Sequence, residues 1–103
     1  MPKRTSSYRA WQLGKLSDPK IAANYLNAAL EDSPDGFLTA LGKVAQAHQM
    51  RTVAGDSGVQ RESLYRMLSK SGNPRYSSLH SVLGAVGLKM SIEPAGPASV
   101  GKR

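Results

Sequence analysis

The stretch VAGDSGVQRESLYRMLS, residues 53–69, joins two short helical patterns through a glycine. Ala54 supplies a small side chain where the two helices would cross, and Gly58 follows where a turn can require a positive φ angle. Apolar side chains on both sides of the turn share an inner face: Val53, Val59, Leu64, Met67 and Leu68. This spacing predicts a helix-turn-helix, with helices over 52–57 and 60–69.

The second helix of this motif directs polar side chains away from the apolar face. They are Gln60, Arg61, Glu62, Ser63, Tyr65 and Arg66. In a helix-turn-helix this outward face enters the major groove of DNA. The alternative is a corner of two helices whose outer face is only solvated. We favour DNA binding because six cations accompany only two carboxylates between residues 43 and 75.

The side chains on this face match the hydrogen-bonding groups of DNA. Arg61 can pair with guanine, Gln60 with adenine, and Glu62 can accept a hydrogen bond from the amino group of cytosine. Five further residues are candidates for phosphate or base-edge contacts: Thr52, Ser63, Tyr65, Arg66 and Lys70. These eight residues form the predicted DNA-binding set.

Composition narrows the class of function. The 103-residue chain has the size of one domain, and its net charge of +7 favours an anionic partner. It contains no cysteine, no glycine-rich phosphate loop and no spacing typical of metal ligands or catalytic groups. We therefore expect no enzyme activity, no metal and no cofactor. No apolar stretch is long enough to span a membrane, and the basic N-terminus lacks the apolar core of a secretory signal, so we expect a cytoplasmic protein.

The chain divides into three parts. Residues 1–16 form a basic arm, and residues 94–103, rich in proline, glycine and serine, form a tail that we expect to be disordered. Residues 17–93 between them form the helix-turn-helix domain. Asp18 and Ser33, each followed by a proline, are predicted to cap its first two helices. The expected fold class is all-α, with about five helices and a short C-terminal β-strand.

That β-strand is predicted after Gly87, which ends the last helix in a left-handed conformation. Residues 88–92 alternate apolar and polar side chains, with Leu88, Met90 and Ile92 on one face. A single strand leaves its backbone groups unpaired. Pairing with the same strand of a second copy would give a homodimer on palindromic DNA. The alternative is a segment that lies across its own core.

Four motifs connect residues 18–92 with a known family. They are YLNAAL (25–30), RESLYRMLS (61–69), GNP (72–74) and GLKMSI (87–92). With these motifs the chain resembles the small addiction-module antidote proteins, which are HigA-like antitoxins with a λ-repressor-like helix-turn-helix. The resemblance implies the antitoxin of a type II toxin–antitoxin module. Such a protein neutralises a RelE/ParE-like toxin by direct binding and represses its own operon as a dimer on double-stranded DNA.

An acidic junction between the first two helices is the candidate for the toxin contact. It comprises Glu31, Asp32 and Asp35. Toxins of the RelE/ParE-like class are often basic, although an acidic junction of this kind usually reflects only helix capping and a solvated loop.

Arg51, Gln60 and Arg75 depart from the family pattern, because they occupy positions where a capping Ser or Thr is expected. Two other functions stay open beside the antitoxin. One is a stand-alone phage-type transcriptional regulator without a toxin partner. The other is a basic protein that binds nucleic acid without sequence preference.

Overall fold

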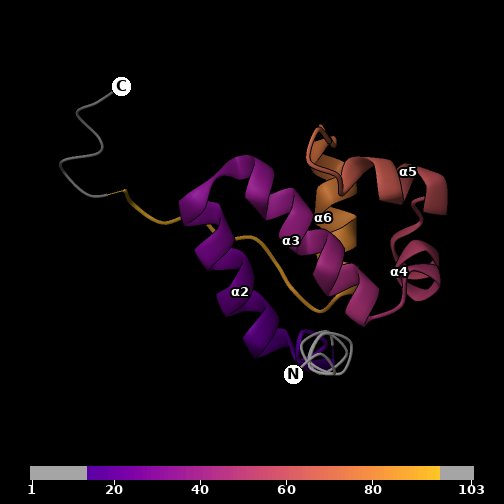
Figure 1. Cartoon of the computed structure of the whole chain (residues 1–103), viewed down its shortest axis with the longest axis horizontal. Helices are drawn as coiled ribbons and strands as arrows, with labels where there is room; N and C mark the ends of the chain where they lie inside the picture. Colours follow the sequence, from indigo (N-terminus) through magenta and orange to yellow (C-terminus); the bar gives the residue numbers. More distant parts are fainter. Residues whose placement is uncertain (1–13, 96–103) are drawn as a thin grey trace, which may run out of the picture.

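The computed structural model describes residues 14–95 and, within them, an all-helical fold (Figure 1). Its five helices are α2 (Pro19–Asp32), α3 (Pro34–Ala47), α4 (Met50–Ser57), α5 (Arg61–Met67) and α6 (Tyr76–Ala85). The all-α prediction is therefore confirmed. Helix α3 crosses the middle of the molecule, with α2 on one side and α4, α5 and α6 on the other (Figure 1).

The first two helices begin at side-chain caps. The Asp18 carboxylate accepts a hydrogen bond from the Lys20 backbone N–H at 2.9 Å, and the Ser33 hydroxyl accepts one from the Gly36 N–H at 3.0 Å. Both caps were predicted from the sequence, and such a cap contributes about 1 kcal/mol. Ser33 alone separates α2 from α3, so α3 returns along α2 in the opposite direction (Figure 1).

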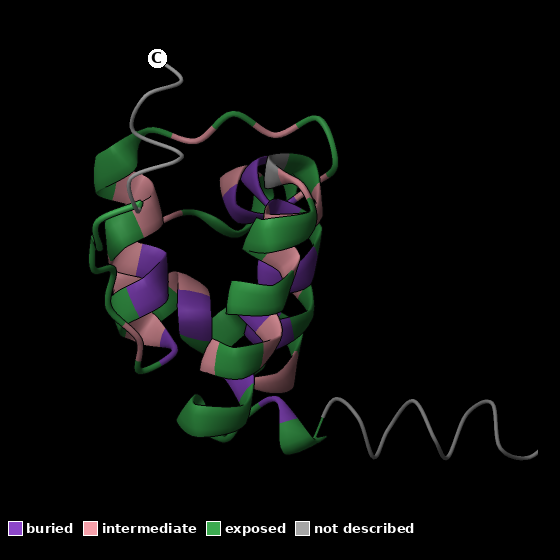
Figure 2. Ribbon diagram, turned by 90° about the vertical axis from the view of Figure 1, so that its left-hand side faces the viewer, coloured by how far each residue is buried: buried purple, intermediate pink, exposed green. Residues whose placement is uncertain are grey.

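All of the helices contribute to one apolar core. Its largest fully buried side chains are Leu41, Val44, Val53, Leu64, Val82 and Val86. Leu16, which precedes α2, is also buried in this core. No polar or charged side chain of residues 14–95 is classed with the buried residues, and the buried positions lie on the inner sides of the helices (Figure 2). The charged side chains are therefore left on the surface.

The turn between α4 and α5 has the predicted left-handed glycine. Gly58 has a φ angle of 78° and donates its N–H to the Ala54 carbonyl at 3.0 Å. The Ser57 hydroxyl accepts a hydrogen bond from the Val59 N–H at 3.2 Å and so closes the turn. Only glycine adopts this backbone conformation without a steric cost.

The helix bounds around this turn differ from the predicted ones. Helix α4 begins at Met50 rather than Thr52, and α5 is shorter at both ends than the predicted 60–69. Gln49, and not Arg51, occupies the position before α4, and its side chain makes no capping hydrogen bond. Arg51 lies inside the helix. Gln49 adopts a φ angle of 73°, which costs a non-glycine residue about 1–3 kcal/mol. Gln60 and Arg75 precede α5 and α6, and neither makes a side-chain cap.

Helix α6 ends as predicted, but the strand after it is absent from the described residues. Gly87 has a φ angle of 83°, and the Leu88 N–H donates to the Leu83 carbonyl at 2.8 Å, which closes the helix end. Residues 88–95 have no regular secondary structure. The prediction of a strand over 88–92 is wrong for the single chain, because no second extended segment among residues 14–95 offers it a partner.

The remaining sequence predictions concern the chain ends. Most of the predicted arm and tail, residues 1–13 and 96–103, lies outside the described residues. Among residues 14–95, no helix combines the length and apolar character needed to cross a membrane.

Candidate functional site

Helix α5 presents one apolar face to the core and one polar face to the surface. Leu64 is fully buried and Met67 is 8% exposed, whereas Tyr65 between them is 51% exposed. Of the eight predicted DNA-binding residues, seven are exposed and Ser63 is half-buried. The packing of Leu64 and Met67 thus determines which side of α5 is available to a partner.

The charged groups of α5 form few contacts with the other residues that the structure describes. The Arg66 guanidinium donates only to the Ser63 hydroxyl, at 3.4 Å, and no ion pair joins Arg61, Glu62 or Arg66 to another described residue. Glu62 lies in the first turn and Arg66 in the last, where each charge also suits the helix dipole. The dipole explains part of this charge pattern, but it gives no reason for Arg61 at the first helical position.

The other two predicted residues come from neighbouring segments. Thr52 lies in the first turn of α4 and is exposed. Lys70 follows α5 and lines a groove between α2 and α3. Lys70 therefore lies at the border of two surfaces, the polar face of α5 and this groove.

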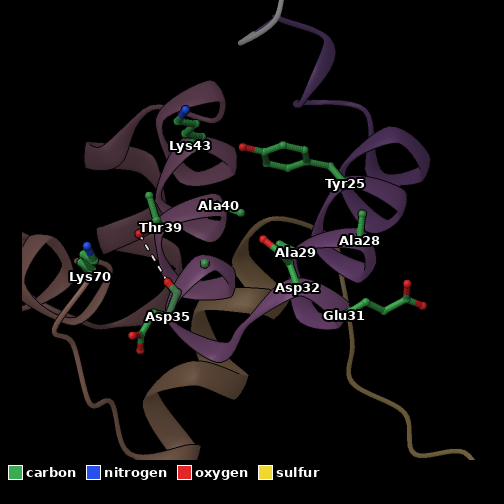
Figure 3. A pocket seen from close by; sticks show the side chains of 11 residues that line it. Tyr25, Ala28, Ala29, Glu31, Asp32, Asp35, Thr39, Ala40, Lys43 and Lys70 are labelled. Carbon is green, nitrogen blue, oxygen red and sulfur yellow. Dashed lines mark hydrogen bonds between the residues drawn. The ribbon is translucent and has the colours of Figure 1, made fainter.

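The groove between α2 and α3 brings the three predicted toxin-contact residues together. It encloses about 690 Å³ and opens to solvent, and Figure 3 shows Glu31 and Asp32 on the α2 side and Asp35 on the α3 side. All three carboxylates are exposed, and none of them forms an ion pair with another residue that the structure describes. A partner can therefore reach them.

Two lysines and an aromatic ring also line this groove, where the sequence did not predict them. Lys43 and Lys70 accompany the three carboxylates, and the Tyr25 ring extends across the groove from α2 toward α3 (Figure 3). Asp35, Thr39 and Lys43 follow one another at four-residue spacing on α3, a pattern that could have indicated a shared face. The groove is of mixed charge rather than uniformly acidic.

The predicted dimer residues lie on the segment after α6. Leu88 is half-buried, Met90 is 44% exposed and Ile92 is 97% exposed. Two large apolar side chains are thus left uncovered at the end of the described chain. No group of three or more His, Asp or Glu residues that could hold a metal ion occurs within the described part of the chain.

Comparison with known proteins agrees with the family resemblance. The sequence model of a family described as "Probable addiction module antidote protein" matches residues 5–94. A protein from Haemophilus influenzae, described as uncharacterized, is 40% identical over 70 residues, which cover 67% of this chain and 72% of that protein. No solved structure matches the chain. Because the family model covers most of its length, the chain belongs to the family of probable addiction module antidote proteins.

Proposed function

We propose that this antidote protein is an antitoxin that binds its own operator through the exposed face of α5 and neutralises a RelE/ParE-like toxin by direct contact. The observation that carries the DNA-binding part is the free polar face of α5. Its charged side chains are exposed and form no ion pair with the described residues, while Leu64 behind them is fully buried.

The geometry around α5 supports a helix-turn-helix of the λ-repressor type. Val53 of α4 and Leu64 of α5 are both fully buried, and Gly58 turns the chain between the two helices. In such a motif the N-terminal residues of the second helix contact base edges. Arg61 occupies the first position of α5 and can form a bidentate pair with guanine, which discriminates against other bases by about 1–3 kcal/mol.

The second part of the proposal assigns the toxin contact to the groove between α2 and α3. Glu31, Asp32 and Asp35 offer carboxylates without an ion-pair partner among the described residues. The Tyr25 ring adds an apolar surface to the same groove. A basic toxin segment would find both charge and contact area there, although Lys43 and Lys70 reduce the net attraction.

DNA binding can be tested by titrating the full chain into the DNA upstream of its own gene and into a scrambled duplex of the same length. We expect tighter binding to the upstream DNA, and we expect Arg61→Ala to remove most of that preference. Lys20→Ala is the matched control, because it removes an exposed cation from α2 and leaves α5 unchanged. If Arg61→Ala and the unmodified chain discriminate equally, base recognition by Arg61 is excluded.

A further inference from the structure

The segment after α6 has a free backbone. Residues 89–95 are all exposed, and none of them forms a hydrogen bond with another residue that the structure describes. Within residues 14–95, the last backbone hydrogen bond along the chain is the one from the Leu88 N–H to the Leu83 carbonyl, which closes α6. A row of unpaired N–H and C=O groups is a template for pairing with another chain.

An uncovered apolar surface adjoins this backbone. A groove of about 250 Å³ lies between α2 and the segment, and its lining includes Leu26, Leu30, Leu88 and Met90 beside the polar residues Lys89, Ser91 and Glu93. Leu30 is 52% exposed, and Ile92 is 97% exposed beside the groove-lining residues 91 and 93. A partner that fits here must bring an extended backbone and aliphatic side chains together.

We propose that residues 88–94 pair antiparallel with the same residues of a second copy, in the register centred on Ser91. This inference deepens the proposed function, on which it rests, because it names the interface of the homodimer expected on a palindromic operator. The partner is therefore another copy of this chain, and not the toxin or the chain's own arm.

The sequence is self-complementary in this register. On one face Lys89 lies opposite the partner's Glu93, and the two-fold axis repeats this pair of opposite charges. On the other face Met90 lies opposite the partner's Ile92, also twice. Ser91 lies on the two-fold axis opposite the same residue of the second copy. No pair in this register places like charges opposite one another.

Neighbouring registers lose this complementarity. If the pairing is centred on Met90, Lys89 faces Ser91 and Glu93 faces Gly87, whose left-handed conformation ends the strand. If it is centred on Ile92, Ser91 faces Glu93 and no opposite charges meet. In the register centred on Ser91, Gly87 lies opposite the residue that follows Pro94 in the second copy, so both strands end there. Pro94 suits a strand end because proline has no N–H to donate.

The apolar side chains of this groove add to what the paired strands can contribute. Met90 lines the groove, so the partner's Ile92 opposite Met90 is brought to the groove mouth close to Leu30. Two strands alone are marginally stable in water. The covering of Met90 and Ile92 by the second copy provides the additional apolar burial.

Cysteine scanning of the full chain tests the register, because the chain contains no cysteine. We expect Ser91→Cys to form a disulfide-linked dimer under mild oxidation, since opposite side chains lie about 5 Å apart at Cβ. Met90→Cys and Ile92→Cys should each link poorly alone and should link to one another when the two variants are mixed. Ser71→Cys, an exposed residue outside the segment, is the matched control.

Exchanging the charges of residues 89 and 93 provides a second test of the register. Restored dimer affinity in the double variant could not result from misfolding. Lys89→Glu and Glu93→Lys should each weaken the dimer roughly tenfold in sedimentation analysis, because two attractive pairs become repulsive. The double variant should restore the affinity. A monomer at all concentrations, or a dimer that resists linkage at Ser91→Cys, would overturn the proposal. A dimer that links at Ser91→Cys but ignores operator DNA and toxin would support the interface and refute the proposed function.

Discussion

The two halves of the molecule are stabilised in different ways. Helices α2 and α3 have 14 residues each, and side-chain caps from Asp18 and Ser33 begin them. Helices α4, α5 and α6 have 8, 7 and 10 residues, and none of them has a side-chain cap. Such short helices are unstable alone, so they depend on packing against the core. The face proposed to bind DNA is therefore carried by the half with less local stabilisation.

The largest effect should come from the residue that anchors α5. Leu64 is fully buried, so Leu64→Ala removes packing atoms and leaves a cavity. We expect the free energy of unfolding to fall by about 2–5 kcal/mol. Urea denaturation followed by circular dichroism measures this loss. A loss below about 1 kcal/mol, well under the range for truncating a buried leucine to alanine, would show that α5 does not depend on the core.

The junction between the two halves offers the next test. Gln49 is exposed and has a φ angle of 73° before α4. Gln49→Gly should be more stable than Gln49→Ala by about 1–2 kcal/mol, because only the glycine variant relieves the backbone strain. Thermal unfolding of the two variants side by side gives the difference. Equal stability would indicate that Gln49 is not strained in solution.

The caps themselves can be compared directly between the halves. Ser33→Ala removes the hydroxyl that accepts the Gly36 N–H and should cost about 1 kcal/mol. Arg75→Ala removes a residue at the equivalent position of α6 that makes no side-chain cap, and it should change stability by less than about 0.5 kcal/mol. Denaturant titration of both variants checks the contrast. Similar losses would contradict the difference drawn between the halves.

The smallest expected effect distinguishes the two charged surfaces. Arg66→Ala should weaken binding to every DNA sequence alike. It should also make the negative slope of log affinity against log salt shallower by about 0.9, as expected for one lost phosphate contact. Lys43→Ala, which removes a cation from the groove between α2 and α3, should leave this slope unchanged. Fluorescence anisotropy with labelled DNA over a salt series measures the slope for each variant. Equal slopes for Arg66→Ala and Lys43→Ala would show that Arg66 on α5 does not contact a DNA phosphate.

Local chemistry made several features of the fold predictable. The caps at Asp18 and Ser33 and the left-handed glycines at 58 and 87 follow from the side-chain types at those positions, and the structure has all four. These features involve only neighbouring residues, so tertiary context has little chance to override them.

Features that depend on tertiary placement were harder to predict. The start of α4 at Met50 follows a positive φ angle at Gln49, which glutamine does not signal. The alternation over 88–92 is a strand pattern, but within the described chain it finds no partner strand. Lys70 lines the same groove as Asp35 although 35 residues separate them in the chain, and charge counts along the chain do not indicate which distant residues share a surface.

The most direct test of the whole account is co-purification. Tagged full-length chain is expressed with its neighbouring reading frame, and the proteins that stay bound are identified by mass. The unmodified chain, Arg61→Ala and the double variant Glu31→Lys with Asp32→Lys are compared in parallel. We expect a stoichiometric protein partner with the unmodified chain and with Arg61→Ala, and loss of that partner from the double groove variant. The groove variant should still bind the operator more tightly than scrambled DNA. Recovery of the unmodified chain alone from verified co-expression, or equal retention of the partner by the groove variant, would contradict it.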